Sequence, residues 1–257
     1  MFFQIIESSS SGNSSFLECD GVRILIDAGA RFRKIKSFLH NRGLSVEDID
    51  AIFITHEHSD HFQSLHSFTQ YNVKVFANRA TAEYIQIKDS ATKKMQWNIF
   101  ETGRTFDFYG IDITSFSILH DTSDPVGFTF QHNGKKLVYA TDFGKITHSI
   151  RDIVSSADIL VLESNYCPVM LERSNRPYSL KCRIRGSSGH LSNADAIALI
   201  ESLPHSVERI FLSHISRQCN DVKHIAELLS KSNIPESLLN CIEIVSPHSE
   251  SSSAFEI

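Results

Sequence analysis

Residues 51–61 read AIFITHEHSDH, an apolar run that leads straight into four side chains of the kinds that bind metals: His56, His58, Asp60 and His61. Imidazole and carboxylate groups are ligands that divalent cations favour in proteins. Four such groups on one tight loop are costly to bury without a metal. A polar surface loop is the alternative interpretation, but the dense H-x-H-x-D-H pattern has few structural uses. The stretch therefore predicts a metal site directly after a strand.

Further ligand types recur in the same context elsewhere in the chain. His120 follows TSFSIL, Asp142 follows KKLVYAT, and His214 follows RIFLS, so each comes at the C-terminal end of an apolar strand. Taken alone, His120 or His214 is more typical of a core or loop histidine. In this shared context we expect four strands to deliver metal ligands to one edge of a sheet.

The ligand count indicates two metals rather than one. An ordinary catalytic zinc uses three protein ligands, whereas this set of candidates has seven members. Seven ligands suit two divalent ions that share one bridging carboxylate. Such His-rich, carboxylate-bridged sites accept zinc, manganese or iron.

The rest of the sequence alternates strand and helix patterns. Short β-branched or aromatic runs predict strands at 1–6, 15–20, 22–29, 50–55, 73–78, 111–119, 126–141, 158–163, 209–213 and 241–245. Apolar periodicity predicts helices at roughly 31–42, 62–70, 79–87, 192–203 and 219–231. Asn133-Gly134 predicts a tight hairpin turn inside 126–141. The mixture favours a layered α/β sandwich.

Composition limits the class of protein. The 257 residues, 41% of them hydrophobic, suit one large α/β domain, which we expect over 1–245, with a flexible serine-rich tail at 246–257. No apolar run approaches the ~20 residues of a membrane span, and the start lacks signal-peptide features. The five scattered cysteines form no C-x-x-C pair. We therefore expect a cytoplasmic protein with reduced thiols and no membrane partner.

The order H-x-H-x-D-H, distant His, Asp and final His resembles the metallo-β-lactamase superfamily of hydrolases. The resemblance implies a four-layer αβ/βα sandwich. It also implies one metal on His56, His58 and His120, a second on Asp60, His61 and His214, and Asp142 as the bridge. Asp27 in LIDAG matches an early aspartate of the family that orients the ligand loop. A turn-capping Asp before Gly29 is the alternative.

Finer motifs narrow the resemblance. The stretches SSSSGNSS, HDTSDPVGF, TDFG, PYSLKCRIRGSSGHLSN and LSHISRQCN are similar to the WalJ/YycJ-type branch, which is implied to contain bacterial exonucleases acting on DNA. Tyr166-Cys167 and Cys219 depart from the pattern of that branch. None of them is among the seven ligand candidates, so the departure concerns substrate binding and not metal binding. Only 47 residues, 143 to 189, separate Asp142 from His190. This spacing leaves no room for the β-CASP cap of other nuclease relatives.

His190, in GSSGHLSNAD, is left without a metal because the other seven residues fill the ligand positions. The resemblance implies that it contacts the scissile phosphate or donates a proton to the leaving group, and imidazole with a pKa near ~6.5 suits that task. Ser192 or Asn193 can cap the following helix, whose first amides would then face an anion. A loop histidine beside turn glycines is the alternative.

Two basic runs stand out against a net charge of −5. The first runs straight into His190 and contains Arg173, Arg176, Lys181, Arg183 and Arg185. It is either a solvated face or a contact for a phosphate backbone. The second contains Arg31, Arg33, Lys34, Lys36 and Arg42, and has the weaker claim because it lies on a predicted helix. The serine-glycine loop 8–15 lacks a P-loop lysine and is expected to border the site.

Two enzymatic hypotheses follow. The first is a di-metal phosphodiesterase of nuclease type that uses a metal-bridging hydroxide, with Asp60, Asp142 and His190 as catalytic residues and Arg183, Arg185, Ser192 and Asn193 as substrate contacts. DNA is favoured over RNA as its substrate. The second keeps the metal site but takes a small molecule: a cyclic phosphodiester, a thioester or a lactone. A non-catalytic module conflicts with the complete ligand set.

Overall fold

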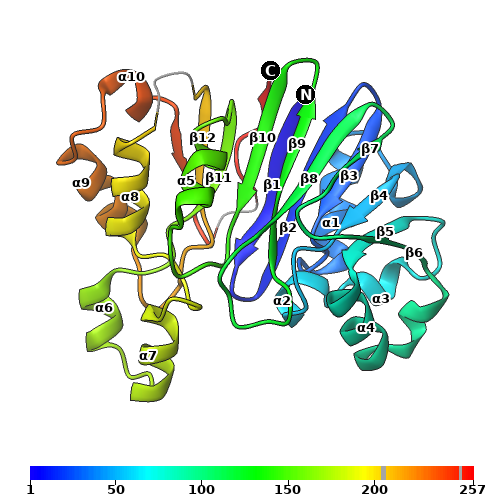
Figure 1. Ribbon diagram of the computed structural model, residues 1–257, viewed down its shortest axis with the longest axis horizontal. Helices are drawn as coiled ribbons and strands as arrows, with labels where there is room; N and C mark the ends of the chain where they lie inside the picture. The colour runs from blue at the N-terminus through cyan, green and yellow to red at the C-terminus, as the bar shows by residue number, and fades with distance from the viewer. Residues whose placement is uncertain (204–206, 249–250) are drawn as a thin grey trace. The chain divides into compact units, whose positions relative to one another are not determined.

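The computed structural model describes residues 1–203, 207–248 and 251–257 (Figure 1). The chain divides into two compact units. The first contains Met1–Ser117, Thr122–Val126 and the described C-terminal segment, and the second contains Ile118–Asp121 and Gly127–His248. Each unit is built around parallel strands, which need crossover connections and are therefore interleaved with helices.

The sheet of the first unit has seven strands among the described residues, in the order β14-β1-β2-β3-β4-β5-β6. They are β1 (Phe2–Ser9), β2 (Gly12–Cys19), β3 (Val22–Ile26), β4 (Ala51–Phe53), β5 (Lys74–Asn78), β6 (Gln96–Phe100) and β14 (Phe255–Glu256). The strands from β14 to β3 pair antiparallel, whereas β3 to β6 pair parallel. The unit also contains the antiparallel hairpin of β7 (Thr105–Phe108) and β8 (Ile111–Ser117).

The helices of the first unit are α1 (Phe32–Asn41), α2 (Ser59–Phe62), α3 (Leu65–Phe68) and α4 (Arg79–Lys88), with short 3-10 helices at Val46–Asp48 and Ser90–Lys94. Helix α1 buries Ile35 and Leu39, which lie one turn apart on one face. These two side chains join a buried cluster that includes Phe16, Leu25 and Ile52 of the sheet. The apolar residues whose spacing predicts this helix are therefore the residues that it buries in the core.

The second unit has parallel strands flanked by helices. Its strands run in the order β13-β12-β11-β10-β9 and are β9 (Val126–His132), β10 (Lys135–Ala140), β11 (Ile159–Glu163), β12 (Arg209–Ser213) and β13 (Ile242–Ile244). Strands β10 to β13 pair parallel, while β9 and β10 form the predicted hairpin. Asn133 and Gly134 hold its turn with φ of 50° and 79°.

Crossover helices join the parallel strands of this unit. They are α5 (His148–Val154), α6 (Pro168–Arg173), α7 (Tyr178–Arg185), α8 (Asn193–Glu201), α9 (Val222–Ser230) and α10 (Glu236–Leu239). Figure 1 shows α8 and α9 toward the left edge of the view, and β12 carries the chain between them. The predicted alternation of strand and helix in the C-terminal half is confirmed.

The C-terminal segment is partly ordered into a strand. Phe255 and Glu256 of β14 pair with Phe3 and Phe2, and Ser252 is buried, with its hydroxyl accepting a bond from the Ile5 N–H. Part of the expected flexible tail, residues 249–250, lies outside the described residues. The extent of the hydrolase domain, 1–245, stays a prediction. Among the described residues, none of the helices has the length and apolar character needed to span a bilayer.

Candidate metal centre

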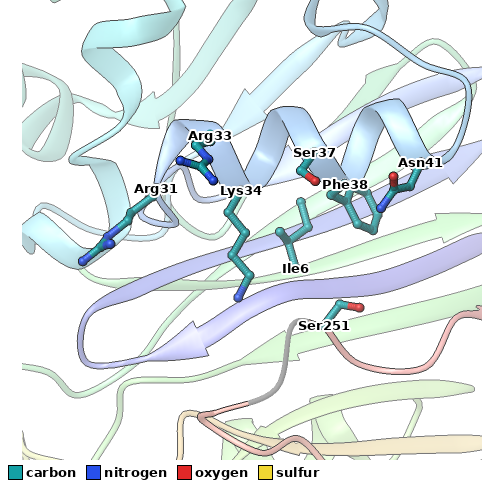
Figure 2. Close-up of a pocket in the computed structure, with 8 residues that line it drawn as sticks. All are labelled: Ile6, Arg31, Arg33, Lys34, Ser37, Phe38, Asn41 and Ser251. Carbon is teal, nitrogen blue, oxygen red and sulfur yellow. The ribbon is translucent and has the colours of Figure 1, made fainter.

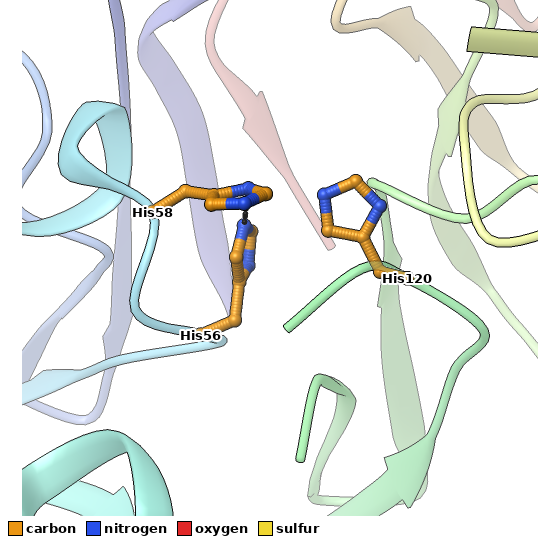
Figure 3. A group of neighbouring side chains, drawn as sticks. All are labelled: His56, His58 and His120. Atoms are coloured by element: carbon orange, nitrogen blue, oxygen red, sulfur yellow. Dashed lines mark hydrogen bonds between the residues drawn. The ribbon is translucent and has the colours of Figure 1, made fainter. Parts of the chain in front are cut away.

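The ligand loop of the first unit begins where β4 ends. His56 and His61 are fully buried, and Asp60 and His61 lie in the short helix α2. Figure 3 shows His56 and His58 with a hydrogen bond of 3.2 Å between His56 Nε2 and His58 Nδ1. The ring centroids of His56 and His61 are 4.0 Å apart. The H-x-H-x-D-H pattern thus gathers its imidazoles into one buried cluster.

Asp27 lies at the carboxyl end of β3 and holds this loop. Its buried carboxylate accepts bonds from the Thr55 N–H at 2.9 Å and from His61 Nδ1 at 2.7 Å. Burial raises the pKa of the Asp27 carboxyl, while His61 and Thr55 act to lower it. A ring whose Nδ1 donates to a carboxylate presents an unprotonated Nε2 to a metal. Asp27 therefore sets the tautomer and orientation of His61.

The serine-glycine loop borders the ligand loop from the other side. Asn13 Nδ2 donates to Asp60 Oδ2 at 3.1 Å, and Gly29 N donates to the Asn13 carbonyl at 2.8 Å. Gly29 itself has no space for a side chain, because a Cβ there would lie 1.6 Å from the Asp60 carbonyl oxygen. Backbone therefore packs directly against backbone where three segments meet: the start of β2, the turn after β3 and the start of α2.

A second ligand cluster lies in the second unit, at the carboxyl ends of β10, β11 and β12. Ligand atoms of Asp142, Glu163, His190 and His214 all lie within 4.8 Å of one another. Asp142 Oδ1 is 3.4 Å from His214 Nε2 and 3.9 Å from His120 Nε2. The carboxyl ends of parallel strands meet at one edge of a sheet, which is why these distant residues converge.

His120, which is also drawn in Figure 3, follows β8 and belongs to the second unit. Its Nδ1 donates to the Gly189 carbonyl at 3.1 Å, which leaves Nε2 on the side of Asp142. Burial lowers the pKa of His120, against the opposing effect of Asp142. A neutral ring with Nε2 unprotonated is the form that binds metals.

The expectation that four strands serve one sheet edge is wrong. Strand β4, which precedes His56, belongs to the sheet of the first unit, whereas β10 and β12 belong to the other sheet. Apolar runs before polar residues identify strand ends, but they do not say which sheet each strand joins. Sheet membership depends on pairing between strands far apart in the sequence.

Glu163 is the residue that the sequence analysis misses. It ends β11 and is fully buried, and its carboxylate accepts four bonds: from the Phe143 and Leu191 N–H groups at 3.1 Å, and from Nδ1 of His190 and His214 at 2.8 Å. Burial by itself would raise the pKa of Glu163, but the two histidines outweigh it and hold that pKa below its ordinary value. The signal was available, because Glu163 follows the apolar run ILVL.

Three of these strand-end residues adopt left-handed backbone conformations. The φ angles of Asp27, Asp142 and His214 are 61°, 60° and 53°. This region is unfavourable for residues other than glycine and is typical of functional sites.

His190 lies in the loop between α7 and α8, with its side chain 22% exposed. Its Nδ1 contacts Glu163, and its backbone N–H donates to the Ile184 carbonyl at 2.8 Å. Ser192 caps α8 by accepting from the Asp195 N–H, as one of the two predicted caps. Asn193 is buried and bonds with Ser164 and Asn220.

The basic strip before His190 forms helices α6 and α7. Arg183 pairs with Asp121, and Arg176 Nε donates to Gln218 Oε1 at 3.2 Å. Tyr178 is 70% exposed, and the Arg185 guanidinium lies 5.5 Å from the centre of its ring. The strip therefore combines partly paired cations with an exposed aromatic ring.

The donor chemistry of both clusters suits divalent metals. Buried imidazoles and carboxylates converge in each unit, and His61, His120 and His214 each have Nδ1 bonded to an oxygen acceptor. That arrangement is the usual support for metal-binding histidines. Each unit therefore supplies a cluster of donor groups that suits the di-metal site expected from the sequence.

Comparisons with known proteins agree with this chemistry. Residues 22–215 match the β-lactamase superfamily domain. The chain is 37% identical to the exodeoxyribonuclease WalJ of Streptococcus pneumoniae serotype 2, over 88% of this chain and 85% of the relative. It is 30% identical to the exodeoxyribonuclease YycJ of Bacillus anthracis, over 89% and 87%.

Solved structures confirm the predicted fold class. The metallo-β-lactamase fold protein YhfI from Bacillus subtilis superposes with a TM-score of 0.72 over 99% of this chain and 98% of that one, at 14% identity. Between Asp142 and His190, where all residues are described, the chain contains only α5, β11, α6 and α7, and no cap domain. The chain therefore belongs to the β-lactamase superfamily, with the metallo-β-lactamase fold.

Proposed function

We propose that this protein is a metal-dependent phosphodiesterase of nuclease type, acting as a DNA exonuclease. The observation that carries the proposal is the complete set of seven ligand residues in a chain with two exodeoxyribonuclease relatives that each match most of its length. The ligand set alone is compatible with several kinds of hydrolysis. The relatives favour a phosphodiester in a DNA strand.

The proposed ligand assignment follows the family motif. One ion would be held by His56, His58 and His120 and the other by Asp60, His61 and His214, and Asp142 would serve both. When bound, two divalent ions lower the pKa of a water and offset charge on the phosphate. The hydrogen bonds that Nδ1 of His61 and His214 donates to Asp27 and Glu163 keep Nε2 of each ring available for this role.

His190 is the proposed proton donor or phosphate contact. With Nδ1–H donated to Glu163, a protonated ring has its second proton on Nε2, available to a leaving oxygen. Glu163 orients the ring by accepting the hydrogen bond from Nδ1–H. The partial exposure of His190 is compatible with contact to a substrate.

Arg183 and Arg185 are the proposed substrate contacts, whereas Ser192 and Asn193, the other two candidates, are buried and would act by holding the start of α8 in place. Arg183 and Arg185 keep 56% and 43% of their side chains exposed despite their partners. Tyr178 adds a surface on which a base could stack, since aromatic rings hold bases without regard to sequence. The cytoplasmic location stays a prediction.

The test is a nuclease assay on end-labelled DNA and RNA with zinc or manganese. We expect wild-type protein to degrade DNA, Asp60→Ala to lose metal and activity, and His190→Ala to lose activity with less loss of metal. Efficient hydrolysis of a thioester, lactone or cyclic phosphodiester, without degradation of DNA or RNA, would refute the proposal. Equal metal loss in both variants would make His190 a ligand.

A further inference from the structure

A groove runs along helix α1 in the first unit, and none of its lining residues is a proposed metal ligand (Figure 2). It has a volume of about 540 Å³. Ile6 of β1 and Phe38 of α1 form its apolar part, and Ser251 of the C-terminal segment lines it as well. Its three charged lining residues are cations, Arg31, Arg33 and Lys34, and the lining includes no acid.

The charge of α1 is not explained by packing. Residues 31–42 contain five Lys or Arg residues and no acid, in a chain whose net charge is −5. Lys34 pairs with Glu7 at 3.4 Å, and Arg42 pairs with Glu18 and stacks on Phe2. Among the described residues, Arg31 and Arg33 have no such partners, and both are exposed. Two unpaired guanidinium groups beside one groove are suited to an anionic ligand.

The groove begins close to the ligand loop of the same unit. Ala28 N donates to the His61 carbonyl at 2.8 Å, and Arg31 follows Ala28 by three residues. Three residues span at most about 11 Å. A nucleic-acid strand rises about 3.4 Å per nucleotide in a duplex, so this upper limit corresponds to at most about three nucleotides. The ten residues of α1 add about 15 Å, or roughly four nucleotides more.

We propose that the groove along α1 binds the phosphate backbone of a nucleic-acid strand, within about seven nucleotides of the bond that is cleaved. The inference rests on the proposed nuclease function and extends it to the uncut part of the substrate. Arg31 and Arg33 contact phosphates, Ser37 and Asn41 offer further hydrogen bonds, and the apolar part lined by Phe38 accommodates sugars. Such contacts hold a strand without reading its sequence.

The experiment compares the double variant Arg31→Gln/Arg33→Gln with wild type. The matched control is Arg79→Gln/Arg104→Gln, because these arginines are also exposed in the first unit, at 77% and 74% of their side chains. Metal-free proteins are titrated into fluorescein-labelled single-stranded DNA of 3 or about 20 nucleotides at several salt concentrations. Fluorescence anisotropy measures binding independently of cleavage, and thermal melting verifies folding.

Each phosphate contact on a single strand contributes about 0.7 to the slope of log affinity against log salt. Losing two contacts should reduce the slope by about 1.4. If the variant and wild type bind the long strand equally at ~1 M salt, the variant should then bind it roughly 25-fold more weakly at ~0.1 M salt. Binding of the trinucleotide should not change, and the control should bind like wild type. With metal restored, KM for long DNA should rise while turnover of a phosphodiester monomer is retained.

Several results would overturn the proposal. The first is an unchanged salt slope in the Arg31/Arg33 variant, and the second is an equal loss in the control, which would indicate bulk charge. Loss of binding to phosphatidylserine vesicles with DNA binding intact would assign the groove to a lipid surface. If wild-type protein neither binds nor degrades nucleic acid, the proposed function itself fails. If wild type degrades DNA and the variant is indistinguishable from it, only the groove proposal fails.

Discussion

Glu163→Gln tests how the buried carboxylate at the end of β11 supports the second ligand cluster. The change keeps the shape of the side chain but replaces one acceptor oxygen with an NH2 group. Oε2 of Glu163 accepts two backbone N–H groups, and Oε1 accepts the two histidine rings. Either orientation of the amide therefore turns its NH2 group toward two existing donors.

The two orientations have different consequences. If the NH2 group faces the backbone, two buried N–H donors lose their acceptor. If it faces His190 and His214, each ring can accept at Nδ1 only by carrying its proton on Nε2. A histidine with a proton on Nε2 cannot bind a metal through that atom. The second orientation thus keeps the hydrogen bonds but removes His214 from the proposed ligand set.

The expected loss of folding free energy is about 2–4 kcal/mol. Hydrogen bonds to a charged acceptor contribute about 1 kcal/mol more than neutral ones, and each orphaned buried donor costs about 1–3 kcal/mol. For a chain of this size, each kcal/mol lowers Tm by roughly 2–4 °C, so the shift is roughly 4–16 °C. Because Glu163 has a lowered pKa, its contribution is present above the pKa of an unfolded glutamate and is lost as the pH falls through the folded value.

Calorimetry of metal-free protein at neutral pH measures this shift without the contribution of metal binding, and elemental analysis of the reloaded protein gives the metal content. Glu208→Gln is the control, because its carboxylate is exposed in the same unit and pairs only at the surface with Lys135. That variant should melt within a degree or two of wild type. A Glu163→Gln protein that melts like wild type and retains two ions would refute the reasoning.

Three further variants or treatments have defined outcomes. Asp27→Asn leaves His61 Nδ1 without its charged acceptor, so we expect about 10–100-fold weaker metal affinity in a chelator competition; unchanged affinity would remove Asp27 from the support of the ligand loop. Burial raises the pKa of the Cys19 thiol to about 11, so at pH 8 only about one molecule in a thousand carries the thiolate. Iodoacetamide on native protein should therefore label Cys182 and Cys241 well before Cys19, as peptide mass spectrometry would reveal; early labelling of Cys19 would contradict the burial. Tyr178→Ala should weaken single-stranded DNA binding by about 1 kcal/mol or more, close to fivefold, whereas Tyr178→Phe keeps the ring and should bind like wild type.

The strand ends could be predicted from the sequence because apolar runs and polar ligand types alternate sharply there. His56, Asp142 and His214 all lie where the sequence analysis expects them, within three residues of the ends of β4, β10 and β12. Glu163 follows the apolar run ILVL just as the predicted ligands follow theirs, but position in the sequence alone does not separate a supporting carboxylate from an ordinary polar strand end. Its role depends on His190 and His214, which reach it only through the parallel register of the sheet.

The irregular parts were harder to predict. Helices α6 and α7 have six and eight residues, with Leu171 and Ile184 as their buried residues, so they lack a clear apolar period. The short strands β6 and β7 were also missed, because their residues are mostly half-buried or exposed. At the C-terminus, Phe255 joins β1 through pairing across the whole chain, which local composition cannot indicate.

The left-handed backbone conformations of Asp27, Asp142 and His214 lower the stability of the fold, while the side chains of these residues are needed for the proposed activity. Each costs about 1 kcal/mol, and glycine or asparagine at these positions would relieve part of that cost. Asp142→Gly should thus release local strain and, at the same time, remove the proposed bridging carboxylate. Selection for thermal stability alone would favour exactly such replacements, so any directed-evolution screen on this scaffold needs an activity step to keep these three residues.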